Sequence, residues 1–163
     1  MSKNNRWLLP EGVDELLPQQ ANRLEQWRRN LLDLFKTWGY EYVIPPLVEY
    51  LDSLLTGVGN DLANDTFKFV DPINGKLLGI RADMTPQVAR IEANRLQQDQ
   101  PVRLCYIGSV LHSRITHTSA TRSPIQVGAE LYGHKGIESD FEIISLMLEC
   151  LTTLGLEDIY IDI

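Results

Sequence analysis

The stretch RLCYIGSVLHSRITHTSATRSPIQVGAELYG, residues 103–133, decides how the fold is interpreted. From residue 125 onward it alternates between apolar residues and others. Because successive side chains of a strand point to opposite faces, one face is apolar and the other carries Gln126, Gly128 and Glu130. A glycine lets a ligand approach the backbone closely, and an amide beside a carboxylate can hold it. The pattern indicates the floor of a small-molecule site, although a half-exposed antiparallel strand would alternate in the same way.

The composition is that of a globular domain rather than of a nucleic-acid-binding one. The 163 residues are 44% hydrophobic and 23% charged, which is enough for one domain with its own core. The net charge of −7 argues against a phosphate backbone as the main partner, because such binding relies on Lys and Arg. We therefore expect residues 1–163 to form a single core domain. Since the sequence stops within an alternating stretch, we expect that domain to be truncated at its C-terminal side.

The cysteines and histidines show no metal-binding or redox pattern. Cys105 and Cys150 lie outside any CxxC motif and are expected to be reduced core residues. His112, His117 and His134 lack metal-ligand spacing and are expected on the surface or in loops. We predict no metal, no cofactor and no catalytic residue. No leader sequence and no apolar run of about 18 residues is recognisable, which predicts a cytoplasmic protein without membrane contact.

Two long amphipathic helices are predicted. Residues 19–38 place large apolar side chains at helical spacing, and Gly39 follows at the position where a glycine commonly ends a helix. The second helix covers residues 138–154. The face of it that we expect to be buried consists of Phe141, Ile144, Met147, Leu148 and Leu151.

The segment after the first helix is expected to be extended. Residues 40–50 contain Pro45 and Pro46, which cannot lie inside a helix or donate to a sheet ladder. This segment is therefore predicted at a sheet edge or a subunit contact. A hairpin follows, with strands at residues 67–69 and 76–81 on either side of an Asn-Gly turn.

The rest of the chain alternates helices and strands. A third helix is predicted from Thr85, as N-cap, with Pro86 at N1, to about residue 97. Further strands are expected at residues 102–107, 110–114 and 124–133, with a last one beginning near residue 158. This order of elements indicates an α+β fold around an antiparallel sheet.

Five segments of the chain resemble the histidyl-tRNA synthetase family, which belongs to the class II aminoacyl-tRNA synthetases. They are LPEGVDELLP at 9–18, GYEYVIPPLVEY at 39–50, GIRADMTPQVAR at 79–90, RLCYIGSVLHSR at 103–114 and QVGAELYG at 126–133. The resemblance implies a class II fold, in which an antiparallel sheet is flanked by helices and this chain forms the first half of the catalytic-like core. It also implies a homodimer through the long helix and the Pro45–Pro46 strand.

The resemblance further implies a histidine-binding site. The family holds the amino group of histidine with a carboxylate and a threonine, matched here by Asp83 and Thr85, and holds histidine from a strand with residues that match Gln126 and Glu130. All four offer hydrogen-bond acceptors to an ammonium group. Asp83 and Thr85 would also serve as helix caps, and Glu130 as a rim carboxylate. Along a strand, Gln126 and Glu130 lie about 13 Å apart, so they would bracket a ligand rather than share one atom.

The ATP-binding half of the family's site does not match. Where the family has Phe-Arg-x-Glu, this chain has Leu-His112-Ser-Arg114. A mostly neutral imidazole replaces a permanent cation, and Arg114 cannot accept a hydrogen bond from adenine. Arg122 matches a family arginine, whereas Ala120 replaces another. These residues are interpreted as a degenerate former ATP site in a solvated loop; the alternative is a loop that still binds phosphate.

The two halves together resemble the regulatory subunits of ATP phosphoribosyltransferase, a non-catalytic group within this family. By that resemblance the partner is the short-form catalytic subunit at the start of histidine biosynthesis, L-histidine is an effector, and no tRNA is bound. One alternative is a divergent histidyl-tRNA synthetase that charges tRNA with ATP. A synthetase-like module that serves another pathway is a further alternative.

Overall fold

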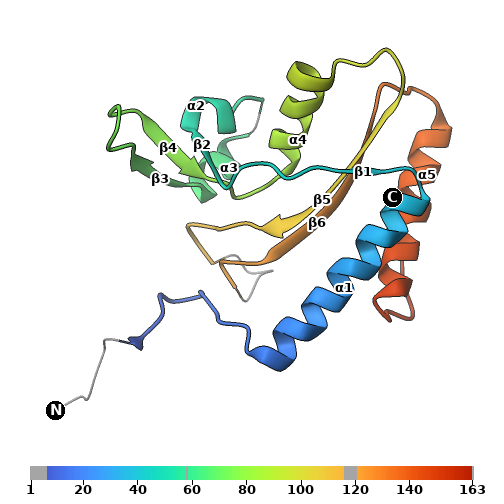
Figure 1. Cartoon of the computed structure of the whole chain (residues 1–163), viewed down its shortest axis with the longest axis horizontal. Helices are drawn as coiled ribbons and strands as arrows, with labels where there is room; N and C mark the ends of the chain where they lie inside the picture. The colour runs from blue at the N-terminus through green and yellow to red at the C-terminus, as the bar shows by residue number, and fades with distance from the viewer. Residues whose placement is uncertain (1–6, 58, 116–120, 163) are drawn as a thin grey trace.

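The computed structural model describes residues 7–57, 59–115 and 121–162. Its central sheet, seen in Figure 1, has the strand order β1-β5-β6. These strands are β1 (Glu41–Tyr42), β5 (Val102–Ser109) and β6 (Ile125–Tyr132). β5 and β6, whose ranges are close to the predicted strands 102–107 and 124–133, pair with each other as a long antiparallel hairpin. β1 pairs with β5 in parallel, which departs from the all-antiparallel sheet expected from the sequence.

A second, smaller sheet lies beside the first and has the order β2-β4-β3, all antiparallel. Its strands are β2 (Val48–Tyr50), β3 (Phe67–Val70) and β4 (Leu77–Ile80). The predicted hairpin is confirmed, and its turn contains Gly75 at φ 73°, a conformation that favours glycine. Residues 43–47, with the tandem prolines, connect the edge strand of one sheet to the edge strand of the other, so the prediction of an edge position is confirmed.

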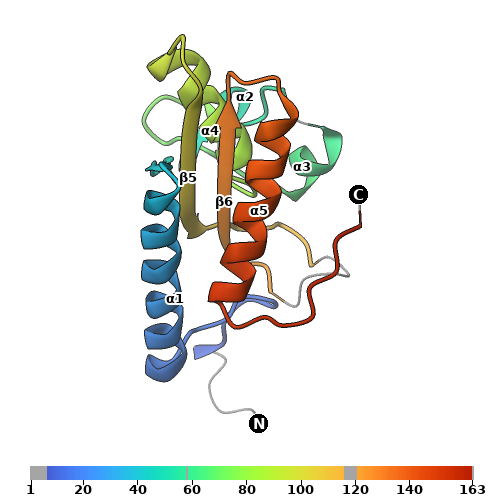
Figure 2. The same cartoon turned by 90° about the vertical axis from the view of Figure 1, so that its right-hand side faces the viewer.

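Two long helices cover one face of the β5–β6 hairpin (Figure 2). They are α1 (Pro18–Thr37) and α5 (Ile137–Thr153), close to the predicted ranges. Leu31 and Phe35 of α1 pack with Cys105 of β5 and Leu146 of α5 in one buried cluster. Cys105 is therefore a free core cysteine, as predicted.

The buried face of α5 differs from the prediction. Phe141 is 74% exposed and Met147 is 43% exposed, whereas Leu146 is 1% exposed. The packed face runs through Leu146 and Cys150, offset around the helix from the predicted stripe. α5 is apolar over more than half of its circumference, so periodicity alone did not indicate which part meets α1.

Short helices lie along the chain between the tandem prolines and β5: α2 (Leu51–Leu54), α3 (Asn60–Asp65) and α4 (Thr85–Ile91), which continues as the π-helical turn η2 (Glu92–Leu96). α4 contacts β6 of the hairpin, whereas α2 packs against β2 and β4 of the second sheet. The N-cap of α4 is Met84, so the prediction of Thr85 as N-cap and Pro86 as N1 was wrong by one position. The reason is that the Thr85 hydroxyl bonds to Tyr106 of β5 and not to the helix backbone.

Two predicted strands do not form. Residues 110–114 contain only an isolated bridge between His112 and Thr66. The amides of Leu111, His112 and Ser113 donate to three separate segments, at Arg81, Arg122 and Asp65, which prevents a regular ladder. Residues 157–162 are also not a strand, and Asp158 within them has φ 56°. Apolar alternation therefore overpredicted strand at both places.

Candidate functional site

The site is built on the polar face of β6, where the predicted alternation is confirmed. In the ladder with β5, Tyr106 lies opposite Gly128, with Gln126 and Glu130 on either side of that glycine. A Cβ atom on Gly128 would lie 2.3 Å from Cζ and Oη of Tyr106. The absence of a side chain at Gly128 therefore lets the tyrosine ring cross β6 between the amide and the carboxylate.

The segment that precedes α4 is fastened to this face by Gln126. Its side-chain oxygen accepts a hydrogen bond from the backbone N–H of Met84 at 2.9 Å. Its side-chain nitrogen donates to Oδ1 of Asp83 at 2.6 Å, and the same oxygen accepts from the backbone N–H of Thr85 at 3.0 Å. Asp83, one residue before the N-cap Met84, therefore accepts from the first backbone N–H of α4 and contacts β6 at the same time.

Tyr106 connects this segment to Glu130. The tyrosine hydroxyl donates to Oε1 of Glu130 at 3.1 Å and lies 2.8 Å from the Thr85 hydroxyl, from which it accepts. We call Asp83, Thr85, Tyr106, Gln126 and Glu130 the acidic network. The structure brings together all four residues predicted from the sequence. It adds Tyr106, which was missed although the glycine opposite it is visible in the sequence.

Burial shapes the electrostatics of the acidic network. It raises the pKa of Glu130 above the usual carboxyl range, an effect that hydrogen bonds from Tyr106 and Thr85 oppose and the nearby Asp83 charge reinforces. Burial likewise raises the pKa of Tyr106, so its hydroxyl stays protonated and can donate to Glu130. Glu130 is half-buried and bonded, which does not fit a solvated rim carboxylate. Two carboxylates at such a site favour a ligand that brings its own N–H donors or positive charge.

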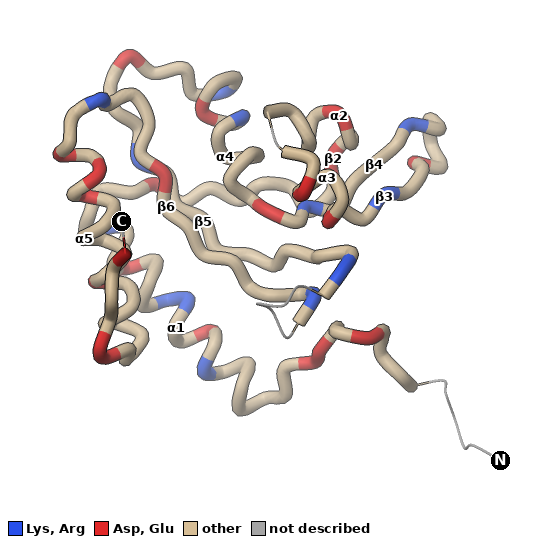
Figure 3. The backbone as a smooth tube through the Cα atoms, turned by 180° about the vertical axis from the view of Figure 1, so that it is seen from behind, with Lys and Arg blue, Asp and Glu red and all other residues tan. Residues whose placement is uncertain are grey.

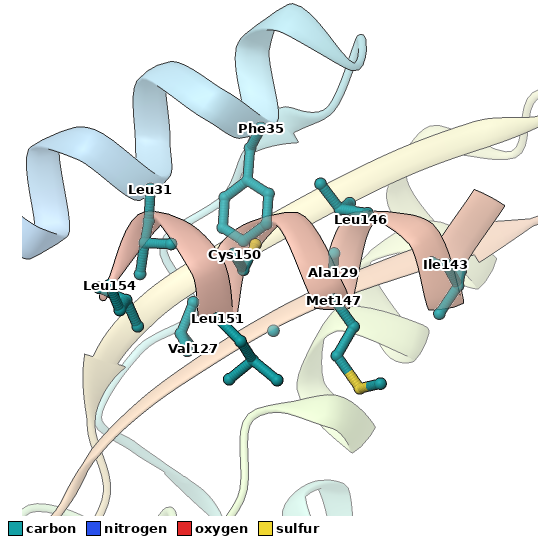
Figure 4. A pocket seen from close by; sticks show the side chains of 11 residues that line it. Leu31, Phe35, Val127, Ala129, Ile143, Leu146, Met147, Cys150, Leu151 and Leu154 are labelled. Atoms are coloured by element: carbon teal, nitrogen blue, oxygen red, sulfur yellow. The ribbon is translucent and has the colours of Figure 1, made fainter. Parts of the chain in front are cut away.

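A hollow of about 400 Å³ adjoins the acidic network. Asp83 and Gln126 line one part of it, and Asp65 and His112 line another. The hollow therefore connects Asp83 and Gln126, two of the residues predicted to bind histidine, with His112 of the degenerate ATP site. A second cavity, of about 250 Å³, lies between α1, α5 and the apolar face of β6 (Figure 4). Leucine, isoleucine, methionine and other apolar side chains line it, so it offers no groups for a polar ligand.

His112, Arg114 and Arg122, which we call the cationic segment, are placed by contacts within the protein. Nε2 of His112 lies 3.1 Å from the carbonyl oxygen of Ala82. The histidine lies outside any regular strand, in line with the loop position predicted for it, but its ring is partly buried rather than solvated. Two hydrogen bonds connect His112 to Arg122 in opposite directions: the His112 backbone N–H donates to the Arg122 carbonyl at 2.8 Å, and the Arg122 side chain donates from Nε to the His112 carbonyl at 3.0 Å.

The two arginines of the cationic segment also have protein partners. Arg114 donates from Nε and Nη2 to Oδ1 of Asp65, at 3.0 and 2.9 Å. The Arg122 guanidinium lies 4.9 Å from the centre of the Phe67 ring and donates to the carbonyl oxygen of Glu11 at 3.1 Å. Both cations are therefore engaged with protein groups. The predicted substitution at Ala120 and the loop residue His117 lie outside the described residues.

The described residues, 7–57, 59–115 and 121–162, contain neither a metal-binding cluster nor a membrane-spanning helix. Among them, no three His, Cys, Asp or Glu side chains gather closely enough to hold a metal ion. The helices of the same ranges include none with the length and apolarity that crossing a bilayer requires.

Comparison with known protein families identifies the family to which this chain belongs. The model of the histidyl-tRNA synthetase family matches residues 12–163, nearly the whole chain. The chain belongs to the histidyl-tRNA synthetase family. The family resemblance seen in the sequence is thereby confirmed, and so is the class II α+β fold, because solved structures of that family superimpose on the chain.

Similar proteins within the family carry a regulatory name. The chain is 60% identical over its full length to a protein of Thioalkalivibrio sulfidiphilus, and 61% identical over 99% of its length to one of Alkalilimnicola ehrlichii. Both are named ATP phosphoribosyltransferase regulatory subunit. The chain spans 41% and 40% of their lengths.

A solved structure gives the same likeness in three dimensions. It is described as an ATP phosphoribosyltransferase regulatory subunit/histidyl-tRNA synthetase from Bacillus halodurans. The superposition has a TM-score of 0.83 at 29% identity and covers 97% of this chain and 40% of that one.

Proposed function

We propose that this chain belongs to a non-catalytic regulatory subunit of ATP phosphoribosyltransferase that binds L-histidine in the acidic network. One observation carries the proposal: Asp83 and Gln126 of the acidic network line a hollow, while the two arginines of the degenerate ATP site are engaged with Asp65, Phe67 and Glu11. The regulatory names of relatives at about 60% identity support it.

Histidine fits the chemistry of the acidic network. Its ammonium group and its imidazole supply N–H donors, which Asp83, Thr85, Gln126 and Glu130 can accept. Tyr106 holds Glu130 and Thr85 in place by hydrogen bonds at 3.1 and 2.8 Å. A ligand that binds two states of the assembly unequally shifts their populations. Bound histidine would change the activity of a separate catalytic subunit in this way.

The residues of the cationic segment are the reason we expect the protein not to adenylate histidine with ATP. Adenylation needs fixed cationic donors directed at the phosphate charge that develops in the transition state. His112 is a weaker donor than an arginine, and Arg114 replaces a hydrogen-bond acceptor for adenine. The ion pair with Asp65 and the stacking on Phe67 further direct the two arginines to protein groups.

The assembly we propose is a homodimer that joins the short-form catalytic subunit. Apolar side chains are exposed along the strands that follow α1: Tyr42, Ile44, Leu47, Val48 and Tyr50. A row of exposed apolar residues on an edge segment is typical of a subunit contact. Free cysteines fit the reducing cytoplasm, where we expect the protein to act.

We expect no tRNA partner. The chain has a net charge of −7. Basic and acidic residues alternate along α1 (Figure 3), where Arg28 and Arg29 both bond to Glu25. These bonds lower the pKa of Glu25 to about 2. An RNA-binding helix would instead leave its arginines available to phosphates.

The test is reconstitution of the full-length protein with the short-form catalytic subunit. We expect phosphoribosyl transfer to require the regulatory protein and to be inhibited by L-histidine, and Glu130→Ala to lose the inhibition but not the assembly. Histidine-dependent exchange of pyrophosphate into ATP by the protein alone would instead identify a synthetase. Failure to copurify with the catalytic subunit would indicate a module of another pathway.

A further inference from the structure

The segment that carries Asp83 and Thr85 is flanked by two buried polar side chains. Arg81 is 7% exposed and Gln87 is 1% exposed. Both donate to the tandem prolines: Nη1 of Arg81 to the carbonyl oxygen of Pro45 at 2.7 Å, and Nε2 of Gln87 to that of Pro46 at 2.8 Å. Two side chains on either side of the candidate ligand segment thus hold consecutive carbonyls of another segment.

Arg81 is an unusual choice for a buried position. Among the described residues it has no carboxylate partner, and its other side-chain bond goes from Nε to the carbonyl oxygen of Ser109 at 2.8 Å. Burying a cation without an anion is costly, so packing alone would favour an apolar residue. A Cβ atom on Gly108 would lie 2.7 Å from Nη2 of Arg81, so the glycine opposite Gln126 leaves space for this guanidinium.

The carbonyl groups of the tandem prolines are held by these two side chains, and backbone bonds from Val43 to Cys105 and from Arg81 to Leu47 hold the segment at its two ends. Pro45 and Pro46 lie between β1 and β2 and have no N–H with which to join a ladder. Their immediate neighbours Ile44 and Leu47 are 76% and 51% exposed. The segment therefore presents apolar side chains outward while its carbonyls are held from the inside by Arg81 and Gln87.

We propose that Arg81 and Gln87 are positioning residues that couple occupancy of the acidic network to the Pro45–Pro46 segment and the subunit surface it carries. The inference rests on the proposed function, since it takes L-histidine as the ligand. A ligand bound to Asp83 and Thr85 favours one position of residues 81–87. When this segment shifts, Arg81 and Gln87 shift with it. Their hydrogen bonds then displace the carbonyl groups of Pro45 and Pro46, and with them the exposed apolar row.

Gln87 is the better probe of this coupling, because it is uncharged and its side chain makes no hydrogen bond to the described residues of β5, whereas Arg81 also donates to Ser109 of that strand. Besides Pro46 it donates to Oε1 of Glu49 at 2.9 Å, and Glu49 keeps Arg90 as a second partner at 2.5 Å. Gln87→Met keeps the length of the side chain and removes both donations. Gln98→Met, at an exposed glutamine of the loop after η2, is the matched control.

The experiment measures the Kd of L-histidine by calorimetry for the full-length protein, alone and in complex with the short-form catalytic subunit. By linkage the ratio of the two Kd values equals the effect of histidine on assembly. We expect a ratio of about five or more in the wild type and in Gln98→Met, since allosteric couplings are typically of that size or larger. In Gln87→Met we expect a ratio within about twofold of one, with the Kd of the free protein changed by less than about threefold.

A second variant, Arg81→Lys, guards against misfolding of the first. Lysine keeps the charge but cannot hold both carbonyls with a rigid fork, so we expect an intermediate ratio. Wild-type ratios in both folded variants, or a wild-type ratio of one despite histidine binding, would overturn the coupling alone. Absence of any histidine binding to the wild type would overturn the proposed function and this inference with it.

Discussion

The acidic network and the cationic segment both contribute to one hollow, through Asp83 and Gln126 on one part and His112 on another, but their polar side chains have different partners. In the acidic network, ladder bonds between β5 and β6 satisfy the backbone, so Gln126 and Glu130 are free to meet other side chains. In the cationic segment the backbone leaves the ladder, and Arg122 is used to satisfy the carbonyl groups of His112 and Glu11. Because Gln126 also fastens a backbone segment, the contrast lies in charge: the acidic network contains two carboxylates, Asp83 and Glu130, whereas both arginines of the cationic segment are engaged with protein groups.

The largest effect is expected in the acidic network. Glu130→Gln keeps an acceptor for Tyr106 but removes the charge that would bind an N–H donor of histidine. A hydrogen bond to a charged group contributes about 2 kcal/mol, which corresponds to about thirtyfold in Kd. Calorimetry with L-histidine on the full-length protein measures it. A Kd within about twofold of the wild type would remove Glu130 from the proposed site.

Gly128→Ala tests whether the tyrosine ring needs the space above the glycine. The new Cβ would overlap Tyr106, and overpacking of this kind costs about 1–3 kcal/mol. Urea unfolding should show that loss. Adding Tyr106→Val should relieve the overlap, so the double variant should lose less stability than the sum of the two single variants. Strictly additive losses would show that the ring does not fill this space.

The pH dependence of the free energy of unfolding should reveal the contribution of Glu130 in the acidic network. Because the folded state raises the pKa of Glu130, it binds this proton more tightly than the unfolded state does. Stability contributed at this residue is therefore present below the usual carboxyl pKa and is lost as the pH rises through the folded pKa. Glu130→Gln lacks that loss, so it should gain stability relative to the wild type between pH 4 and neutral pH. A variant that becomes relatively less stable over this interval would contradict the sign.

The smallest effect is expected in the cationic segment. The side chain of Arg114 is 60% exposed, and exposed ion pairs contribute about 0–1 kcal/mol. Asp65→Asn should therefore change the free energy of unfolding by less than about 1 kcal/mol. It should also leave ATP binding undetectable, since His112 and Arg122 keep their own partners. Appearance of ATP binding in this variant would show that the Asp65 pair alone blocks the nucleotide.

Much of this arrangement can be predicted from the sequence where a single local pattern determines the structure. Strict alternation gave β6 and its polar face, and the Asn-Gly turn gave the β3–β4 hairpin. Gln126 and Glu130 stood out through that alternation, whereas Asp83 and Thr85 came from the family resemblance. Tyr106 was missed because it lies in a largely apolar strand and only the cross-strand register places it against Gly128.

The failures occur where tertiary contacts outweigh local pattern. Residues 110–114 have apolar character, but their amides donate to Arg81, Arg122 and Asp65 rather than to a strand. Thr85 is a good N-cap residue whose hydroxyl is taken by Tyr106. The packed face of α5 was offset because the helix is broadly apolar, and only contact with α1 identifies Leu146 as its buried centre.

The most direct test of the contrast between the two halves is a paired titration of the full-length protein with L-histidine and with ATP. We expect a saturable heat of binding with L-histidine, with weaker binding in Glu130→Gln. With ATP at millimolar concentration we expect no heat of binding. Saturable ATP binding that is weakened by Arg122→Ala would contradict it, because the cationic segment would then serve a nucleotide after all.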